Sequence, residues 1–294
     1  MNRKRTFDMK KKSAFAAAAI LMSLASGAAV PAFDTLIAHR GESHDAPENT
    51  LPAYKTAVER GFGFECDIYL SRDGRVFTFH DDNLKRTTGG ANKNACKDVT
   101  WDELQNVDVG NWGKWKDSHF KGTRPALLEE VLALARDGRR IYVEVKPGPK
   151  IVPAIKDIFA AQSNATSANT LFISFNEESC KALKEAMPEY KVYWLTSSTR
   201  KTGSGEKIPV TADYIIDKCR ELGVDGVDAH FDRGIVTEEL IKSVRDAGFE
   251  FHVWTVDDLS DTITAFSRGV QSVTTNCAQK QLDAWQTALR MMRK

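Results

Sequence analysis

Short apolar runs that read as β-strands alternate with helix-like segments from residue 34 to the end of this 294-residue chain. The pattern predicts eight strands, at residues 35–39, 64–70, 140–146, 170–175, 191–196, 226–230, 250–256 and 270–275. A helix is predicted after each strand, at residues 50–60, 126–136, 151–162, 177–186, 212–222, 237–247, 259–267 and from 278 onward. Eight strand–helix units in about 260 residues are typical of an α/β chain folded as a (β/α)8 TIM barrel.

An open, doubly wound parallel sheet is the alternative for such a pattern. That fold usually needs a glycine-rich phosphate turn after its first strand, and the segment after residue 39 contains none. Two polar segments interrupt the alternation. Residues 81–124 follow an accessory strand at 76–80, and we expect them to form a small inserted subdomain after the second strand. Residues 197–209 are expected to be a long flexible loop at the barrel mouth, in the position of a substrate-side flap.

The inserted segment carries three tryptophans, Trp101, Trp112 and Trp115. Aromatic residues in such a segment can contact a lipid surface or an aromatic head group. We expect instead that they form the small core of the insertion, since large aromatic rings stabilise mainly by burial.

The first 32 residues have the features of a signal peptide. A basic start is followed by an apolar stretch at residues 14–30, and Val30, Pro31 and Ala32 offer small residues at a cleavage site. An uncleaved membrane anchor is the alternative, because the apolar stretch is close to the minimum length of a span. We expect cleavage, which leaves residues 33–294 as an exported barrel, periplasmic or secreted, with no stable membrane span.

Charge and cysteine content narrow the class of protein. The whole chain has 41 Lys and Arg against 40 Asp and Glu; removing residues 1–32 leaves 35 against 39, a net charge of −4. A weakly acidic chain has no electrostatic footprint for nucleic acid. Five cysteines without a C-x-x-C spacing leave at least one thiol unpaired in a monomer.

Charged and titratable residues gather at the carboxyl ends of the first three predicted barrel strands and of the accessory strand, where barrel enzymes place their chemistry. Residues two apart on one strand point to the same face. Together these residues comprise His39, Arg40, Glu65, Asp67, His80, Glu144 and Lys146. Inward-facing charges are costly unless they are paired, so their joint presence predicts a site.

The residue types suit cleavage of a phosphate diester. Three carboxylates (Glu65, Asp67 and Glu144) can hold one divalent cation, and all-oxygen ligation favours Ca²⁺ or Mg²⁺ over zinc. Arg40 and Lys146 would bind the phosphate. The cation and these two side chains supply four positive charges against three negative ones, which leaves one for the diester. His39 and His80 would be the general acid and base, in either order.

The motifs of this chain resemble those of the glycerophosphodiester phosphodiesterase family. The resemblance covers essentially the chain from Thr35 to about Asn276. It rests on motifs in order: His39-Arg40-Gly41, Pro47-Glu48-Asn49-Thr50, Glu65-x-Asp67, His80-Asp81, Leu84-x-Arg86-Thr87-Thr88-x-Gly90, Asp108-Val109-Gly110, Phe120-x-Gly122, Pro125-x-Leu127, Glu144-x-Lys146 and Trp254-Thr255-Val256.

The resemblance implies a barrel with an inserted subdomain and the same metal, phosphate and acid–base residues. It adds Trp254, Glu48 and Asn49 as substrate-binding residues, with Trp254 near the glycerol moiety and the other two supporting the loop after the first strand. It also implies glycerol 3-phosphate and an alcohol as products, formed by attack of either the glycerol hydroxyl or water. One departure is visible. The family often has Thr-Asp after the last strand, whereas this chain has Thr275-Asn276, a position we expect to lie outside the chemistry.

Three alternatives to the leading interpretation concern function. A phospholipase acting on intact or lyso-phospholipids could use the same two-histidine barrel, but it would need an apolar rim that the sequence does not offer. A catalytically silent binding protein would be expected to have lost a histidine or a metal carboxylate, and none is lost. A metal-dependent amidohydrolase is disfavoured, because the H-x-H of its first strand is missing.

Overall fold

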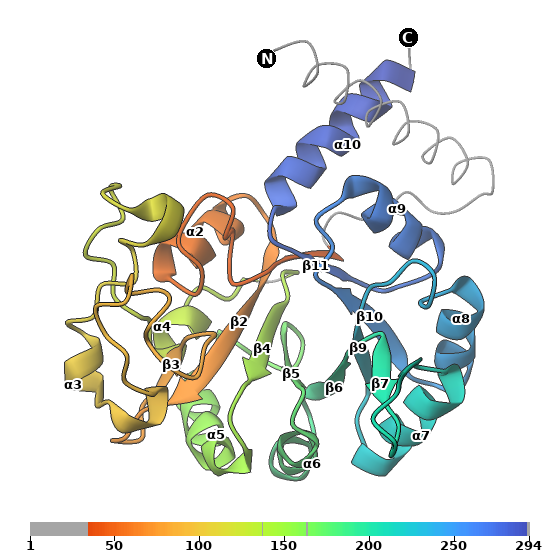
Figure 1. The fold of residues 1–294 in the computed structure, drawn as a ribbon, viewed down its shortest axis with the longest axis horizontal. Coiled ribbons are helices and arrows are strands. Elements are labelled where there is room, and N and C mark those ends of the chain that lie inside the picture. Colours follow the sequence, from red (N-terminus) through yellow and green to blue (C-terminus); the bar gives the residue numbers. More distant parts are fainter. Residues whose placement is uncertain (1–34, 137, 163, 293–294) are drawn as a thin grey trace.

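The computed structural model describes residues 35–136, 138–162 and 164–292. Within these residues, eight parallel strands form a barrel: β1 (Leu36–Ala38), β2 (Gly63–Leu70), β4 (Ile141–Val145), β5 (Thr170–Ser174), β6 (Lys191–Thr196), β9 (Gly226–His230), β10 (Glu250–Trp254) and β11 (Val273–Thr275). The first strand pairs with both β2 and β11, which closes the sheet (Figure 1). The predicted TIM barrel is therefore confirmed.

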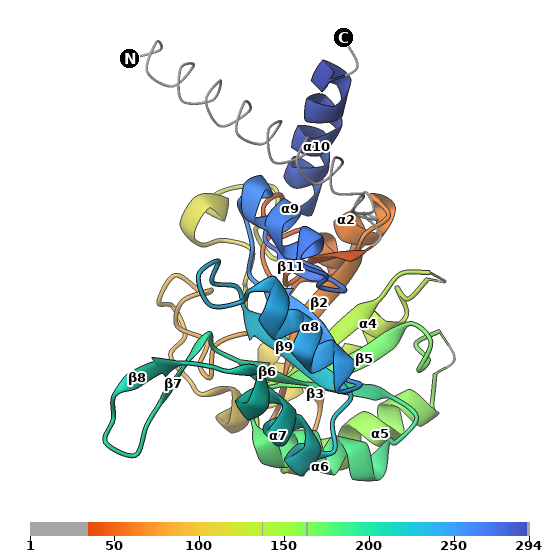
Figure 2. The ribbon, with the colours of Figure 1, turned by 90° about the vertical axis from the view of Figure 1, so that its right-hand side faces the viewer.

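A helix follows each barrel strand along the chain (Figures 1 and 2). All but the last of these helices surround the barrel, whereas the last projects from its end. The helices are α2 (Leu51–Glu59), α4 (Leu128–Leu132), α5 (Val152–Ala160), α6 (Glu177–Ala186), α7 (Ala212–Leu222), α8 (Glu238–Asp246), α9 (Leu259–Ser267) and α10 (Ala278–Met292). Of these, α4 is much shorter than the predicted 126–136. After Ala133 the backbone bonds change to three-residue spacing, from Leu134 to Val131 and from Ala135 to Leu132, which ends the α-helix.

Side chains alternate between two cores along each strand. On β2, Phe64, Cys66 and Ile68 point outward into the main hydrophobic core beneath the helices. The barrel interior has its own apolar cluster, made of Ile37, Tyr142, Leu171, Ile173, Tyr193 and Leu195. Because the side chains of a strand alternate between its faces, Glu65 and Asp67 must point into the barrel.

The inserted segment leaves the barrel after β3 (Val76–Thr78), which pairs antiparallel with β2. It contains α3 (Trp101–Leu104) and two short 3-10 turns, η2 (Cys96–Asp98) and η3 (Gly113–Trp115). Its separate small core consists of Phe77, Phe79, Leu84, Cys96, Val99, Trp101, Leu104 and Val109. Gly110 lies at a close approach of two backbone segments, because a Cβ there would stand 1.9 Å from the carbonyl oxygen of Phe120.

Only one of the three tryptophans of the insertion belongs to this core. Trp101 is buried, whereas Trp112 and Trp115 are half-buried. The guanidinium of Arg86 lies 5.0 Å from the centroid of Trp112, and the ammonium of Lys114 lies 4.4 Å from that of Trp115. The expectation of a shared tryptophan core is therefore wrong for these two residues, whose rings support surface cations instead.

The segment after β6 is a β-hairpin and not the expected flexible loop. The strands β7 (Thr199–Lys201) and β8 (Lys207–Pro209) pair antiparallel, and the hairpin projects from the barrel (Figure 2). Neither face of the hairpin is buried, so its polar sequence lacks the alternation of apolar and polar residues that predicts a strand. At its tip, Gly205 has a φ of +84°, a conformation that glycine adopts at no steric cost.

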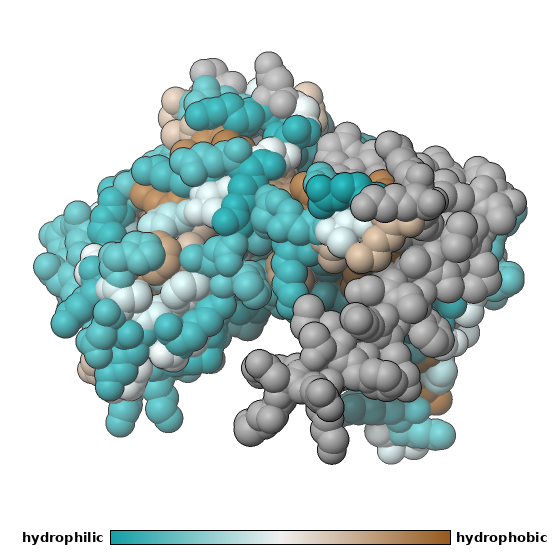
Figure 3. Space-filling model, turned by 90° about the horizontal axis from the view of Figure 1, so that it is seen from above, coloured by the Kyte–Doolittle hydropathy of each residue, from teal (hydrophilic) through white to brown (hydrophobic). Residues whose placement is uncertain are grey.

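The predicted signal peptide lies outside the described residues. No helix among residues 35–136, 138–162 and 164–292 is both long enough and apolar enough to cross a membrane. Seen from the end that carries α10, hydrophilic side chains cover most of the described surface (Figure 3). All five cysteines are buried and free.

Candidate active site

The turn after β1 is strained in a way that serves the site. Arg40 and Gly41 both have positive φ angles, of 57° and 77°. A Cβ on Gly41 would lie 2.6 Å from the carbonyl carbon of Ala53, so only glycine fits. The turn lets the backbone N–H of Arg40 donate to Glu65 Oε2 at 2.8 Å. A non-glycine residue at positive φ is uncommon and costs about 1 kcal/mol or more, which marks this turn as functional.

Three buried carboxylates form the centre of the site. Glu65 and Asp67 stand on β2, and Asp67 is in register with Glu144 on β4. One oxygen from each lies within 4.8 Å of the others. Among the described residues, Glu65 Oε1 has no hydrogen-bond partner. Clustered, partly unpartnered carboxylate oxygens fit a hard divalent cation such as Mg²⁺ or Ca²⁺.

Burial and mutual repulsion control the charge of this cluster. Burial, together with the charges of Asp67 and Glu144, raises the pKa of Glu65 well above its usual value. Burial and the charge of Asp67 raise the pKa of Glu144 to about 7. Burial also opposes ionisation of Asp67, but the positive charges of Arg40 and Lys146 outweigh it and lower the pKa. The cluster therefore holds protons that a bound cation would displace.

The two basic side chains stand beside the carboxylates. Lys146 Nζ lies 2.7 Å from Glu144 Oε1 and 3.2 Å from Asp67 Oδ1. Arg40 Nε lies 3.3 Å from Asp67 Oδ2, and its Nη1 donates to Glu48 Oε1 at 2.7 Å. Both basic side chains line the pocket, so they can meet an anion there.

His39 is oriented by a residue that the sequence analysis placed outside the chemistry. Its Nδ1 lies 2.7 Å from Asn276 Oδ1, and its Nε2 lies 3.8 Å from Glu65 Oε2. Asp257 accepts from the backbone N–H and from Nδ2 of Asn276, each at 2.8 Å. The amide oxygen must therefore face His39, which places the ring proton on Nδ1 and leaves Nε2 free. Burial and the charge of Arg40 lower the pKa of His39 to about 4.

The expectation for Asn276 is thus wrong, and its physical reason is barrel closure. Asn276 follows β11, the last strand, and β11 pairs with β1. Closure brings Asn276 against His39, 237 positions away in the chain. The rule that chemistry gathers at the carboxyl ends of barrel strands, applied to the last strand as well as to the first three, would have included this residue.

His80 has a different partner. Its Nδ1 lies 2.8 Å from Asp81 Oδ1. Arg86 holds that carboxylate from Nε and Nη2, both at 2.8 Å, and also donates to Glu48. Burial and the nearby charges of Arg40 and Lys146 lower the pKa of His80, against the opposing effect of Asp67. Asp81 and Arg86 belong to the family motifs of the sequence, but the motifs alone predict no role for them.

Glu48 and Asn49 lie behind the pocket and do not line it. Asn49 is buried, donates from Nδ2 to Asp67 Oδ2 at 2.7 Å and accepts from the backbone N–H of Asp67. Tyr54 in turn donates to Asn49 Oδ1 at 2.7 Å. Asn49 therefore fixes one carboxylate of the cluster, while Glu48 joins Arg40 to Arg86. Their placement is that of supports for the loop and not of groups that touch a ligand.

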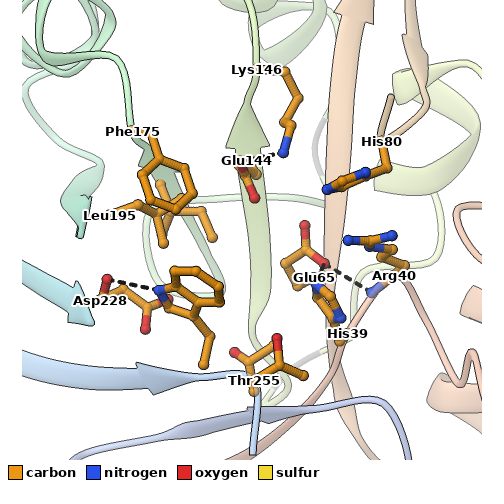
Figure 4. Close-up of a pocket in the computed structure, with 13 residues that line it drawn as sticks. His39, Arg40, Glu65, His80, Glu144, Lys146, Phe175, Leu195, Asp228 and Thr255 are labelled. Atoms are coloured by element: carbon orange, nitrogen blue, oxygen red, sulfur yellow. Dashed lines mark hydrogen bonds and ion pairs between the residues drawn. The ribbon is translucent and has the colours of Figure 1, made fainter. Parts of the chain in front are cut away.

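The opposite wall of the pocket is mostly apolar. Figure 4 shows Phe175, Leu195 and Asp228 across from His39, Arg40 and His80. Trp254 also lines this wall and donates from Nε1 to the backbone oxygen of Asp228 at 3.1 Å. The space between the two walls is partly open to solvent, so a ligand can enter the pocket from outside. No signal used in the sequence analysis singled out Asp228 for this site.

With this geometry in place, comparison with known proteins decides the family. The model of the glycerophosphoryl diester phosphodiesterase family matches residues 39–280. The chain belongs to this family. It is therefore a phosphoric diester hydrolase.

Individual members of the family are similar over most of the chain. The glycerophosphodiester phosphodiesterase of Caldanaerobacter subterraneus subsp. tengcongensis is 29% identical over 246 residues, covering 82% of this chain and 93% of that protein. A solved Oleispira antarctica phosphodiesterase in complex with the product sn-glycerol-3-phosphate matches with a TM-score of 0.72 and 25% identity, over 86% of this chain and 96% of that one. The glycerophosphodiester phosphodiesterase of Thermotoga maritima shares the fold, with a TM-score of 0.63, 23% identity and coverage of 85% and 97%.

Proposed function

We propose that this chain is a metal-dependent enzyme that cleaves glycerophosphodiesters into glycerol 3-phosphate and an alcohol. The observation that carries the proposal is one pocket that brings together a carboxylate cluster, two basic side chains and two histidines. The similar Oleispira antarctica enzyme holds sn-glycerol-3-phosphate as a product, which supports the same product here.

The carboxylate cluster fits one divalent cation. Glu65, Asp67 and Glu144 would hold it, and their oxygens match the ligand preference of Mg²⁺ or Ca²⁺. When bound, such a cation supplies Lewis-acid stabilisation of charge on the non-bridging phosphate oxygens. Arg40 and Lys146 would bind the same phosphate oxygens, and both stay charged at neutral pH because carboxylates lie beside them.

His39 is proposed as the general base. Its proton on Nδ1 is held by Asn276, so its free Nε2 lone pair faces the pocket. A pKa of about 4 keeps the free imidazole neutral, and therefore able to accept a proton, at neutral pH. It would take the proton from the attacking hydroxyl, which belongs either to the glycerol moiety or to water.

His80 is proposed as the general acid. Its partner is the carboxylate of Asp81 and not a neutral amide. This adjacent negative charge favours the imidazolium form and offsets part of the lowering of the pKa by burial, Arg40 and Lys146. The side chain of His80 is 32% exposed, against 14% for His39, which places it nearer the open side where an alcohol can leave. It would protonate the departing alkoxide.

The test is release of glycerol 3-phosphate by the purified full-length protein from a panel of glycerophosphodiesters, with Mg²⁺, with Ca²⁺ and with a chelator. We expect cation-dependent release that His39→Ala and His80→Ala each reduce at least 10²-fold. His44→Ala is the matched control, since this exposed histidine lies in the same loop, paired with Asp45, and should leave the rate unchanged. Release that is insensitive to the chelator, or near-wild-type rates in either variant, would contradict the proposal.

We also propose that the protein is exported, on the evidence of residues 1–32. The buried cysteines are compatible with an oxidising compartment, because burial raises the pKa of the thiols of Cys96, Cys180 and Cys219 to about 12 and so suppresses the reactive thiolate. Fractionation of cells that express the full chain, with N-terminal sequencing of the product, tests the proposal. A protein that keeps its first 32 residues in the cytoplasm would refute it.

A further inference from the structure

Asp228 contributes a buried carboxyl group to the pocket wall. The residue is 1% exposed, and neither Oδ1 nor Oδ2 has a hydrogen-bond partner among residues 35–136, 138–162 and 164–292. It lines the same pocket as His39, Arg40 and Lys146. Leaving a buried carboxyl group unsatisfied costs several kcal/mol, so a structural role alone does not explain it.

Its position is opposite the phosphate-binding groups. In the order of strands around the barrel, β9 lies four places from β2 in either direction, so Asp228 faces the carboxylate cluster across the pocket. Figure 4 shows it at the far wall from Arg40. Burial and the charge of Glu144 raise the pKa of Asp228 well above its usual value, with no basic group to oppose them.

His252, a neighbour of Asp228 inside the barrel, is a polar residue whose hydrogen bonds are satisfied within the protein. His252 is in register with Asp228 on β10 and is fully buried. Its Nδ1 lies 2.7 Å from Ser272 Oγ, and its Nε2 lies 3.4 Å from Glu250 Oε2. Since His252 is satisfied within the protein and Asp228 is not, Asp228 is left with its hydrogen-bonding capacity directed to a ligand.

The charge of the pocket limits what that ligand group can be. A carboxyl group offers no positive charge to a phosphate, so the phosphate stays with Arg40 and Lys146. The part of the substrate that reaches the far wall must therefore carry hydroxyl groups that can hydrogen-bond to Asp228. The two free oxygens of one carboxyl group match two hydroxyls on adjacent carbon atoms. We propose that Asp228 binds the vicinal diol of the substrate's glycerol moiety, an inference that rests on the proposed function.

This arrangement orients the whole substrate. The glycerol moiety lies toward β9, the phosphate lies between Arg40 and Lys146, and the alcohol leaves past the partly exposed His80. The enzyme therefore selects the deacylated glycerol moiety strictly and the alcohol loosely. Acylation of one hydroxyl removes a donor that Asp228 needs, so lysophospholipids are poor substrates.

Binding of two small phosphates tests the proposal on the full-length protein with Mg²⁺ by titration calorimetry. sn-Glycerol 3-phosphate has the diol, and n-propyl phosphate has the same chain without hydroxyls. We expect the wild type to bind the first about 10–100-fold more tightly, the usual discrimination from a hydrogen bond or two to a charged or buried group. Asp228→Leu should remove this preference and change the affinity for n-propyl phosphate less than threefold.

Controls separate recognition from folding. Asp225→Asn removes a carboxylate at the opposite end of β9, where it pairs with Lys184 at 3.0 Å, and should keep the wild-type preference. If Asp228→Leu does not fold, the near-isosteric Asp228→Asn takes its place. The wild-type affinities for the two propanediol monophosphates, each of which lacks one hydroxyl, then give a second test. Each missing hydroxyl should weaken wild-type binding.

Other outcomes overturn the inference or the function separately. Equal affinity of the wild type for both phosphates, or an equal loss for both in Asp228→Leu, overturns the diol assignment. Phosphoethanolamine is a third probe. If Asp228→Leu weakens the binding of phosphoethanolamine and of neither other phosphate, Asp228 binds an ammonium group, which also overturns the diol assignment. If the protein hydrolyses glycerophosphodiesters but shows no preference for the diol, the inference about Asp228 is wrong and the proposed function stands. If it prefers the diol but releases no glycerol 3-phosphate, the proposed function is wrong and the diol site stands.

Discussion

The contact between His39 and Asn276 predicts that a residue at the barrel seam controls catalytic rate. Replacing Asn276 by leucine keeps the side-chain volume and removes the oxygen that lies 2.7 Å from Nδ1 of His39. The ring N–H is then left without its acceptor in a side chain that is 14% exposed, at a cost of about 1–3 kcal/mol. Since 1.36 kcal/mol corresponds to a tenfold rate change, kcat should fall roughly 10–100-fold.

The effect should appear in kcat and not in KM, because Asn276 does not line the pocket. The double variant Asn276→Asp/Asp257→Asn is the conservative one. It keeps an acceptor for Nδ1 and restores a donor for the 2.8 Å contact between positions 276 and 257, so it should retain kcat within about fivefold. Its negative charge stabilises the imidazolium form and so raises the pKa of His39. The acid limb of the kcat/KM profile should therefore move to higher pH.

The assay is steady-state release of glycerol 3-phosphate as a function of substrate concentration and pH. Ser43→Ala is the matched control, because the Ser43 hydroxyl reaches the same amide oxygen only at 3.5 Å. An unchanged kcat in Asn276→Leu, or a loss confined to KM, would refute the reasoning. A double variant Asn276→Asp/Asp257→Asn as slow as the leucine variant would also refute it.

Three further predictions follow from buried charges. Glu65→Gln should abolish cation binding in calorimetry and reduce turnover at least 10³-fold. It should also raise the melting temperature of the metal-free protein at neutral pH, because glutamine needs neither a buried charge nor the proton that Glu65 takes up on folding; a lower melting temperature would contradict this. Asp81→Asn should lower kcat about 10–100-fold with little change in KM, because the imidazolium of His80 loses its carboxylate; equal kcat would contradict it. Burial raises the pKa of Glu42 from 4.5 to about 7, so the folded protein binds more protons than the unfolded chain between these values and stability falls as the pH rises through them. Glu42→Gln should therefore match the wild type at pH 4.5 and exceed it by about 2–3 kcal/mol at pH 8 in denaturant unfolding, whereas a pH-independent difference would contradict the prediction.

The predicted parts of the site depend on local rules. Glu65 and Asp67 are two residues apart on one strand, so strand geometry alone places both carboxylates on one face. Glu144 and Lys146 repeat the spacing, and the barrel rule then brings the carboxyl ends of neighbouring strands together. The same local rules failed at residues 197–209, where a hairpin exposed on both faces has no hydrophobic alternation to detect.

The sequence by itself determined the number of strand–helix units, the closed barrel and the residues at the carboxyl ends of β1, β2 and β4. The tertiary structure alone decided which long-range partners those residues have. Asn276 reaches His39 because closure pairs the last strand with the first. Asp228 stands out only in the folded structure, where no group of the described residues donates to either oxygen of its carboxyl group. Spacing along a strand is a local property, whereas contact across a barrel and the absence of a partner depend on the positions of all the surrounding chain.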